Sequence, residues 1–373
     1  MADDKLPPVA LLVNHREYSG WKSVRVTRTI RSLAGSFALS VSERWRPDMF
    51  PWPIREEDAC IVTLDKKPVI TGYVDSREQS LSASEHAFSV SGRDRAAALI
   101  DNSAGIGAFQ LNAIGVLEAC RLIAKPFDIQ VSLQPGMADP AISTTIKKPG
   151  TTHRKTRALA AAMHTVAIAP GDSGWDVIDR ICRLVGVLPV SDGAGGILLT
   201  RAGSERATTM LIEGENVLRA TARRDGTERY RRYVVVGQGT GRGDDESLAH
   251  IDVSAADEDL FVRRGDRMLI IRQGGDITRD FAAQVAAWEK SVRAARALTV
   301  GVTVQGWAQA DGTLWPINAM ARIHCPAIDI VRDDMLITEA TYAHSVDGGT
   351  TTELTLVPKD ALNPAPPTPA GNT

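Results

Sequence analysis

Two stretches of the chain share one pattern. Val62-Thr-Leu-Asp-Lys-Lys-Pro-Val-Ile-Thr-Gly-Tyr-Val74 can be laid without a gap over Ile328-Asp-Ile-Val-Arg-Asp-Asp-Met-Leu-Ile-Thr-Glu-Ala340. Each predicts a short strand, a charged turn and a second strand that contains Ile-Thr, and a last alternating strand follows at 86–91 and at 352–357. Hairpins also resemble one another by chance, so the pattern alone leaves duplication and coincidence both open.

The first stretch lies in a region, up to about Arg95, that reads as strands and turns. Residues 24–30 and 36–42 alternate apolar with polar side chains, and Ala34-Gly35 between them marks a turn. With the strands expected at 59–64, 69–74 and 86–91, they predict a small barrel or sandwich.

The middle of the chain mixes helices and strands. We expect a helix over 110–125 that ends at Pro126, and a strand over 127–133. A second helix should begin after Gly171-Asp172-Ser173 and end at Gly186, and it leads into strands at 187–190 and 197–200. Between the two helices, residues 136–170 have little pattern, and part of this stretch is expected to be mobile.

The last third of the chain again contains segments with the residue pattern of strands. Residues 233–237 and 298–304 are expected strands, with a helix from about 276 to 297 between them. The Gly-rich run 237–245 is expected to be a flexible loop, and the Pro-rich tail 363–373 to be disordered.

Composition excludes several classes of protein. The 373 residues carry 43 Lys and Arg against 45 Asp and Glu, a net charge of −2, which argues against a protein that coats nucleic acid by charge. At 5% the aromatic content is too low for a carbohydrate or base-stacking surface. The N-terminus has no secretion signal, and no apolar window is long enough to span a membrane. We therefore expect a soluble protein made in the cytoplasm.

Short motifs do not indicate catalysis. Gly171-Asp-Ser-Gly174 is similar to a serine-protease motif, but it fits a helix N-cap better. The glycines of 237–243 lack the spacing and the helix of a nucleotide-binding loop. None of the seven histidines has a second ligand at metal spacing, and the carboxylate runs 56–58 and 244–246 read as solvated turns. We expect no catalytic, cofactor-binding or metal-binding residues. The widely spaced cysteines, all expected to be buried thiols in a reducing compartment, are Cys60, Cys120, Cys182 and Cys325.

The sharpest charge feature is the arginine-rich stretch Arg223–Arg232, which continues to Tyr233. If it is a strand, Arg229 and Arg231 share one face. A surface strand held by ion pairs is the favoured interpretation; phosphate contact or a charged subunit interface is the alternative.

The sequence as a whole resembles a known family, the Mu-like phage tail protein P family, which forms the baseplate hub of contractile tails. Similar segments run in order through about residues 9–360. They include 17–30, 34–45, Ile70-Thr-Gly-Tyr-Val74, Val90-Ser-Gly-Arg-Asp-Arg95, 99–103, 125–129, Pro170-Gly-Asp-Ser-Gly-Trp175, 191–193, 199–203, Arg231-Arg-Tyr-Val-Val-Val-Gly-Gln238, 287–289 and Gly312-Thr-Leu-Trp-Pro-Ile-Asn318.

This resemblance implies a β-rich α+β fold with two related small β-barrel domains and an α+β domain inserted between them. It places the first tube-like barrel at 1–95, the α+β domain at 96–205, and the second barrel at 206–245 and 298–360. A loop-and-helix insertion then covers 246–297, and a disordered tail covers 361–373. Three copies of two barrels give six, so the internal similarity fits a ring that adapts a sixfold tube to a threefold spike.

The expected function is thus a homotrimeric baseplate hub with a channel for transient passage of DNA. Its partners would be the tail tube protein, the central spike protein and other baseplate proteins, without stable membrane insertion or cofactors. It would be assembled in the host cytoplasm and located in the virion tail. The alternatives are a tail-associated cell-wall-degrading enzyme and a DNA-binding protein that uses the Arg223–Arg232 stretch.

Overall fold

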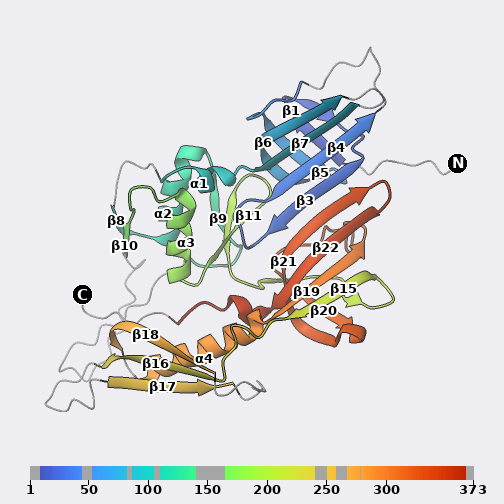
Figure 1. The fold of residues 1–373 in the computed structure, drawn as a ribbon. Helices are drawn as coiled ribbons and strands as arrows, with labels where there is room; N and C mark the ends of the chain where they lie inside the picture. The colour runs from blue at the N-terminus through green and yellow to red at the C-terminus, as the bar shows by residue number, and fades with distance from the viewer. Residues whose placement is uncertain are drawn as a thin grey trace.

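The computed structural model of the chain describes residues 9–43, 53–81, 86–104, 110–139, 164–239, 250–257, 267–277 and 279–366. Within them, the longest sheet has fourteen strands, and two smaller three-stranded sheets and one two-stranded sheet accompany it. The prediction of a β-rich mixed fold is confirmed, and Figure 1 shows the helices gathered beside the sheets. None of the described helices is long and apolar enough to cross a membrane.

Seven strands make up the first part of the long sheet, which we call the first β-unit. They are β1 (Val9–Val13), β2 (Arg16–Tyr18), β3 (Ser23–Thr29), β4 (Ser36–Glu43), β5 (Ala59–Leu64), β6 (Lys67–Leu81) and β7 (His86–Asp94). Their order in the sheet is β3-β4-β7-β6-β5-β1-β2. The predicted hairpin of β3 and β4 is confirmed, with Val24 and Val26 buried on one face as the alternation requires.

The second β-unit supplies the rest of this sheet. Its strands are β13 (Glu205–Arg206), β14 (Leu211–Ile212), β15 (Val217–Arg224), β19 (Leu298–Gln305), β20 (Ala319–Cys325), β21 (Ile330–Ser345) and β22 (Gly349–Pro358). They run in the order β15-β19-β22-β21-β20, and β13 and β14 pair with β20. Two short 3-10 turns flank β21 and β22: η3 (Pro326–Ile328) and η4 (Lys359–Leu362).

One local prediction in this unit is wrong. The charged run Arg332–Asp334 was expected to be a turn, but it lies inside β21. The reversal comes earlier, at η3, where Asp329 takes the left-handed conformation with φ of 57°. Charge alone marked the wrong place, because exposed strand residues are charged as readily as turn residues. Closure of either β-unit into a barrel is not observed among the described strands.

The middle domain has its own small sheets and core. It contains α1 (Ala97–Asp101), β8 (Gln110–Ile114), α2 (Val116–Ala124), η1 (Lys125–Phe127), β9 (Val131–Leu133), β10 (His164–Ala167), α3 (Gly174–Leu184), β11 (Leu188–Ser191) and β12 (Ile197–Thr200). The helix expected over 110–125 is only half right, because its first residues form β8. That strand pairs with β10, a partner about fifty residues away that helical spacing could not reveal. The strand expected over 127–133 begins only at Val131.

A side sheet and a long helix sit between β15 and β19 in sequence. The strands β16 (Arg232–Gly239), β17 (His250–Ala256) and β18 (Met268–Ile277) form a separate sheet, covered by α4 (Arg279–Arg296). The sequence placed β16 with the second barrel and read 246–297 as loop and helix. In the structure β16 pairs with β17 and β18 instead. The strand itself was predicted correctly, but its partner was not.

Several loop predictions lie outside the described residues. They concern 140–163 of the expected mobile stretch, 240–249 of the Gly-rich loop and 367–373 of the tail.

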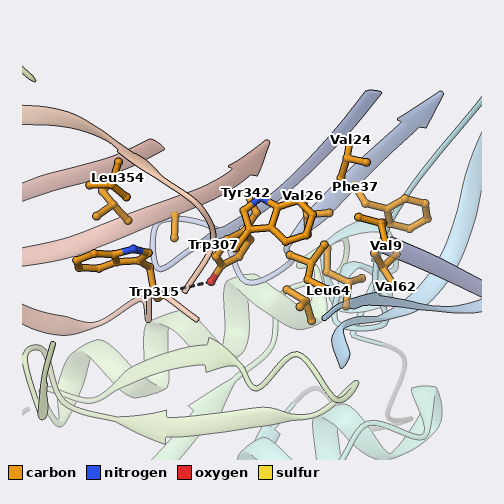
Figure 2. Packing of buried hydrophobic residues seen from close by; sticks show 14 of the residues in the cluster. Val9, Val24, Val26, Phe37, Val62, Leu64, Trp307, Trp315, Tyr342 and Leu354 are labelled. Carbon is orange, nitrogen blue, oxygen red and sulfur yellow. Dashed lines mark hydrogen bonds between the residues drawn. The ribbon is translucent and has the colours of Figure 1, made fainter. Parts of the chain in front are cut away.

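The largest core cluster runs through both β-units. Figure 2 shows Trp307 and Tyr342 of the second unit beside Val26 of the first, with Trp315 and Leu354 on one side of them and Phe37 on the other. The Tyr342 hydroxyl donates to the carbonyl oxygen of Trp315 over 2.5 Å, and burial raises the pKa of that phenol to about 12. The two units therefore fold around shared apolar contacts as well as a shared sheet.

All four cysteines are buried and unpaired with one another as disulfides, which confirms the prediction of buried thiols. Burial raises the pKa of Cys60 to about 12, and a hydrogen bond with Cys120 together with burial raises the pKa of Cys182. We expect the native protein to react negligibly with Ellman's reagent at pH 8, because the thiolate is the reactive form. The denatured protein should release four equivalents. Rapid reaction of any thiol in the native state would contradict this arrangement.

Candidate functional site

The protease-like segment is a helix cap. Ser173 is the N-cap of α3: its hydroxyl accepts from the backbone N–H of Asp176 over 3.0 Å, and the Asp176 carboxylate accepts from the backbone N–H of Ser173 over 3.1 Å. This reciprocal pair is a capping box, which satisfies two amides that the helix leaves free. At the other end Gly186 has φ of 65°, as expected for a helix terminus. Both sequence-based interpretations are confirmed.

A metal-binding cluster is not found in the described part of the chain. Its His, Cys, Asp and Glu side chains form no group of three that could hold a metal ion. The Gly-rich run begins at the end of β16 and continues into residues outside the description.

The arginine-rich stretch is occupied largely by ion pairs. Arg229 forms a bidentate pair with the buried carboxylate of Asp257, at 2.6 and 2.9 Å. Arg223 and Arg224 bond Asp225 and Asp329, each at 3.1 Å. These pairs support the ion-paired interpretation over phosphate binding. The stretch is not one strand, however: β15 ends at Arg224, a turn follows, and β16 starts at Arg232.

The most informative site is the junction of the two β-units, where β3 pairs antiparallel with the second half of β21. The register runs from Glu339 opposite Thr29 to Ser345 opposite Ser23. Figure 1 shows these two strands side by side between the units. Because backbone hydrogen bonds cross this line, the two units form one continuous sheet.

Side chains add specific contacts across the junction. The hydroxyls of Thr27 and Thr341 face each other at 2.9 Å, and Thr341 is buried. On the same face of the sheet, the exposed side chain of Arg25 donates to Glu353 over 3.0 Å, which joins β3 to the strand beyond β21. The exposed ion pair contributes little stability, but the buried hydroxyl pair fixes the register.

The two units share one strand order. In the first unit the order β3-β4-β7-β6-β5 is matched in the second by β15-β19-β22-β21-β20, and the strands occur in the same sequence along the chain. The side sheet and α4 replace the short β3–β4 turn. One difference is direction: β1 pairs antiparallel with β5, whereas β13 and β14 pair parallel with β20.

Local irregularities repeat as well. The long strand β6 has a bulge against β7 at Asp75, between Val74 and Ser76, and β21 has one against β22 at Thr338, between Ile337 and Glu339. A bulge is a specific local feature, so the same position in both units is strong support for duplication. The bulges make Val74 equivalent to Ile337. This register differs by three residues from the gap-free overlay of the two sequences, which paired Val74 with Ala340.

The segments that precede β5 and β20 correspond to each other as well. Ile54 precedes β5 and Trp315 precedes β20, and both side chains are fully buried. The Glu57 amide donates to the Val74 carbonyl oxygen over 2.8 Å, as the Asn318 amide donates to the equivalent Ile337 carbonyl oxygen over 2.8 Å. The structure thus favours duplication where the sequence left it open.

A second polar site fastens the middle domain to the first β-unit. Asp94, at the end of β7, is almost completely buried and accepts from the Ser191 hydroxyl over 2.5 Å and from the Ala96 backbone N–H over 2.9 Å. Arg28 of β3 donates to the carbonyl oxygen of Ser191 over 2.9 Å. Burial raises the pKa of Asp94, while the Ser191 and Ala96 bonds oppose the rise. Sequence reasoning assigned these residues no role, and only the position of Asp94 within the family-like segment 90–95 could have drawn attention to it.

We expect Asp94→Ala to lower the free energy of unfolding by about 1–3 kcal/mol, because it leaves buried donors of Ser191 and Ala96 without an acceptor. Urea unfolding followed by tryptophan fluorescence measures the loss. The matched control is Asp333→Ala, which removes an exposed carboxylate of β21 and should change stability by less than about 0.5 kcal/mol. Equal effects of the two substitutions would show that the buried network contributes nothing.

Known protein families match parts of this architecture. Three family models match the chain: the N-terminal domain of Mu phage baseplate assembly protein GpP-like at residues 8–94, the second domain of baseplate hub protein gp44-like at 152–201, and the fourth domain of Mu phage baseplate assembly protein GpP at 278–365. The first and third models correspond to parts of the two β-units. The resemblance to Mu-like baseplate hub proteins is confirmed, and none of these models is an enzyme family.

Particular relatives agree. Baseplate hub protein gp44 of Escherichia phage Mu is 28% identical over 360 residues, 95% of this chain and 88% of that protein. The 43 kDa tail protein of prophage MuSo2 from Shewanella oneidensis is 26% identical, with a TM-score of 0.79 over 96% of this chain and 99% of the other. The tail protein from Neisseria meningitidis MC58, at 22% identity, shares the fold with a TM-score of 0.72 over 95% and 98% of the two chains.

Proposed function

We propose that the chain is a structural baseplate hub that assembles as a homotrimeric ring between the sixfold tail tube and the threefold central spike. The observation that carries the proposal is the repeated β-unit, with the same strand order and the same bulge in both copies. Three chains with two such units present six similar units around one axis. A ring of this kind matches a sixfold partner on one face and a threefold partner on the other.

In the assembled ring, each β-unit would curve into the barrel that the sequence suggested, and the centre would remain open for DNA. The ion-paired arginines and the net charge of −2 support a conduit that does not grip DNA. The middle domain, fastened by the Asp94 network, would face other baseplate proteins. The hub ring would assemble in the host cytoplasm and then become part of the virion tail.

The proposal is tested by mixing the purified chain with the tube and spike proteins of the same phage or prophage. We expect both to co-elute with it, in six copies of tube subunit and three of spike subunit per three hub chains. A variant tube protein with its hub-facing surface altered serves as the control. Failure to bind either protein at tens of micromolar concentration would overturn the adaptor role.

A further inference from the structure

The long strands β6 and β21 are each divided by a bulge into two halves, and among the described strands one of these four halves lacks a partner on one edge. The first half of β6 pairs with β5 and the first half of β21 pairs with β20. The second half of β21 pairs with β3. The second half of β6, Asp75–Leu81, pairs with β7 on one side, and among the described strands none pairs with its other side.

Burial follows the same division. Thr338, Ala340, Thr341 and Tyr342 in the second half of β21 are buried, whereas every residue of Asp75–Leu81 is exposed. The apolar side chain of Leu81 is 70% exposed. Within the described part of the chain, one copy of the repeated unit thus has a covered edge, and the equivalent edge of the other copy has no covering strand.

The complementary edge also exists in the chain. β3 covers β21, and the equivalent of β3 in the second unit is β15, which ends the long sheet and pairs along its length only with β19 among the described strands. Ala220 and Ala222 are partly buried between exposed neighbours, in the alternation that Val24 and Val26 show in β3. Within one chain these two edges lie at separate ends of the two units (Figure 1).

From these two edges we infer that Asp75–Leu81 of one chain pairs antiparallel with Val217–Arg224 of the next chain, and that this strand pair closes the ring. The inference rests on the proposed trimer and adds its interface. Three such pairs between chains would alternate with the three β3–β21 pairs within chains. Exposed strand edges are templates for such pairing, and a second copy of this chain carries the matching edge.

The internal repeat also sets the register. The bulges make Ser76 equivalent to Glu339, and the pairing of Val300 and Phe37 with the last strand of each unit makes Ala222 equivalent to Val26. Transfer of the β3–β21 register then places Glu78 opposite Arg223 and Ser80 opposite Thr221.

Charge agrees with this register. The buried hydroxyl pair Thr27 and Thr341 is replaced by Arg223 and Glu78, which are oppositely charged. Arg77 falls opposite Arg224, but each has a carboxylate on its own chain, Glu56 at 3.2 Å and Asp329 at 3.1 Å. Leu81 falls opposite Ala220 and is covered on pairing.

Disulfide trapping tests the register directly. The Ile30 amide donates to the Thr338 carbonyl oxygen, so Ile30 and Thr338 form a hydrogen-bonded pair. The pairs between such positions, among them Arg25 with Ala343, are the closely spaced, non-hydrogen-bonded ones. Ser80 and Thr221 are equivalent to Ala343 and Arg25, so their Cβ atoms are expected within disulfide distance. The native cysteines are buried and should not interfere. We expect Ser80→Cys/Thr221→Cys to give covalent dimers and trimers on oxidation, visible on non-reducing gels. Each single variant, and the out-of-register pair Ser80→Cys/Arg219→Cys, should give little product.

Charge reversal provides an independent readout. Glu78→Arg and Arg223→Glu should each raise the concentration at which half of the chains are trimeric by about tenfold, since three pairs per ring become repulsive. The double reversal should restore the wild-type value.

The outcomes separate the two proposals. Light scattering could show a trimer while oxidation of Ser80→Cys/Thr221→Cys gives no covalent dimers and trimers, or while the out-of-register pair gives as much covalent product. Either result would overturn the strand pairing and leave the hub proposal standing. Single reversals without effect on a stable trimer would do the same. Absence of any trimer from the wild-type protein would overturn both.

Discussion

Replacement of Tyr342 by alanine is expected to lower the free energy of unfolding by about 3–5 kcal/mol. Tyr342 lies where β21 meets β3, is fully buried between the two units, and holds the carbonyl oxygen of Trp315. Truncation removes a large apolar contact and leaves that carbonyl without its partner (Figure 2). Urea denaturation of the purified protein, followed by circular dichroism, measures the change.

Tyr342→Phe separates the two contributions. The ring remains, so only the hydrogen bond to Trp315 is lost, and we expect a decrease of about 1–3 kcal/mol. If alanine costs no more than phenylalanine, the junction does not depend on shared apolar packing, and the description of one core across both units is wrong.

Gly72→Ala is expected to be nearly as damaging, because no side chain fits at this position of β6. A Cβ atom there would lie 1.9 Å from the carbonyl oxygen of Arg93 and 2.8 Å from the amide nitrogen of Arg95. Both are main-chain atoms of the neighbouring segment, so relief requires a shift of β7 itself. We expect a loss of about 3 kcal/mol or more, above the usual range for one added methyl group.

Gly226→Ala is the matched control. It lies in the turn after β15, a Cβ atom there would meet nothing within 4 Å, and its φ is not in the left-handed region. Its stability should stay within about 0.5 kcal/mol of the wild type in the same urea titration. If Gly72→Ala were as mild as Gly226→Ala, the close approach of β6 and β7 would be wrong.

Local structure was predictable where one segment determines it. The N-cap at Ser173, the end of α3 at Gly186 and the β3–β4 hairpin follow from neighbouring residues, and all three are confirmed. The long helix α4 was also expected within three residues of its observed bounds. Capping, turn chemistry and side-chain periodicity act over a few residues, so a single sequence is sufficient.

Strand partners were not predictable, because pairing depends on segments far apart. Nothing in the residues of β8 or β16 identifies β10 or β18 as their partners, and so a helix and a barrel strand were expected in their place. The burial of Asp94 depends in the same way on Ser191, ninety-seven residues away. Even the repeat, the best sequence-level signal, was found at a shifted register, since the bulges that align the two units are visible only in the pairing.

The central claim is that three chains with two related β-units form one ring. The most direct measurement is single-particle imaging of the purified full chain, with its mass in solution measured over a wide concentration range. We expect a particle of three chains with a threefold outline, six similar β-units around an open centre and β6 of each chain beside β15 of the next. A protein that remains monomeric at every concentration, or a ring built from a different number of chains, would contradict it.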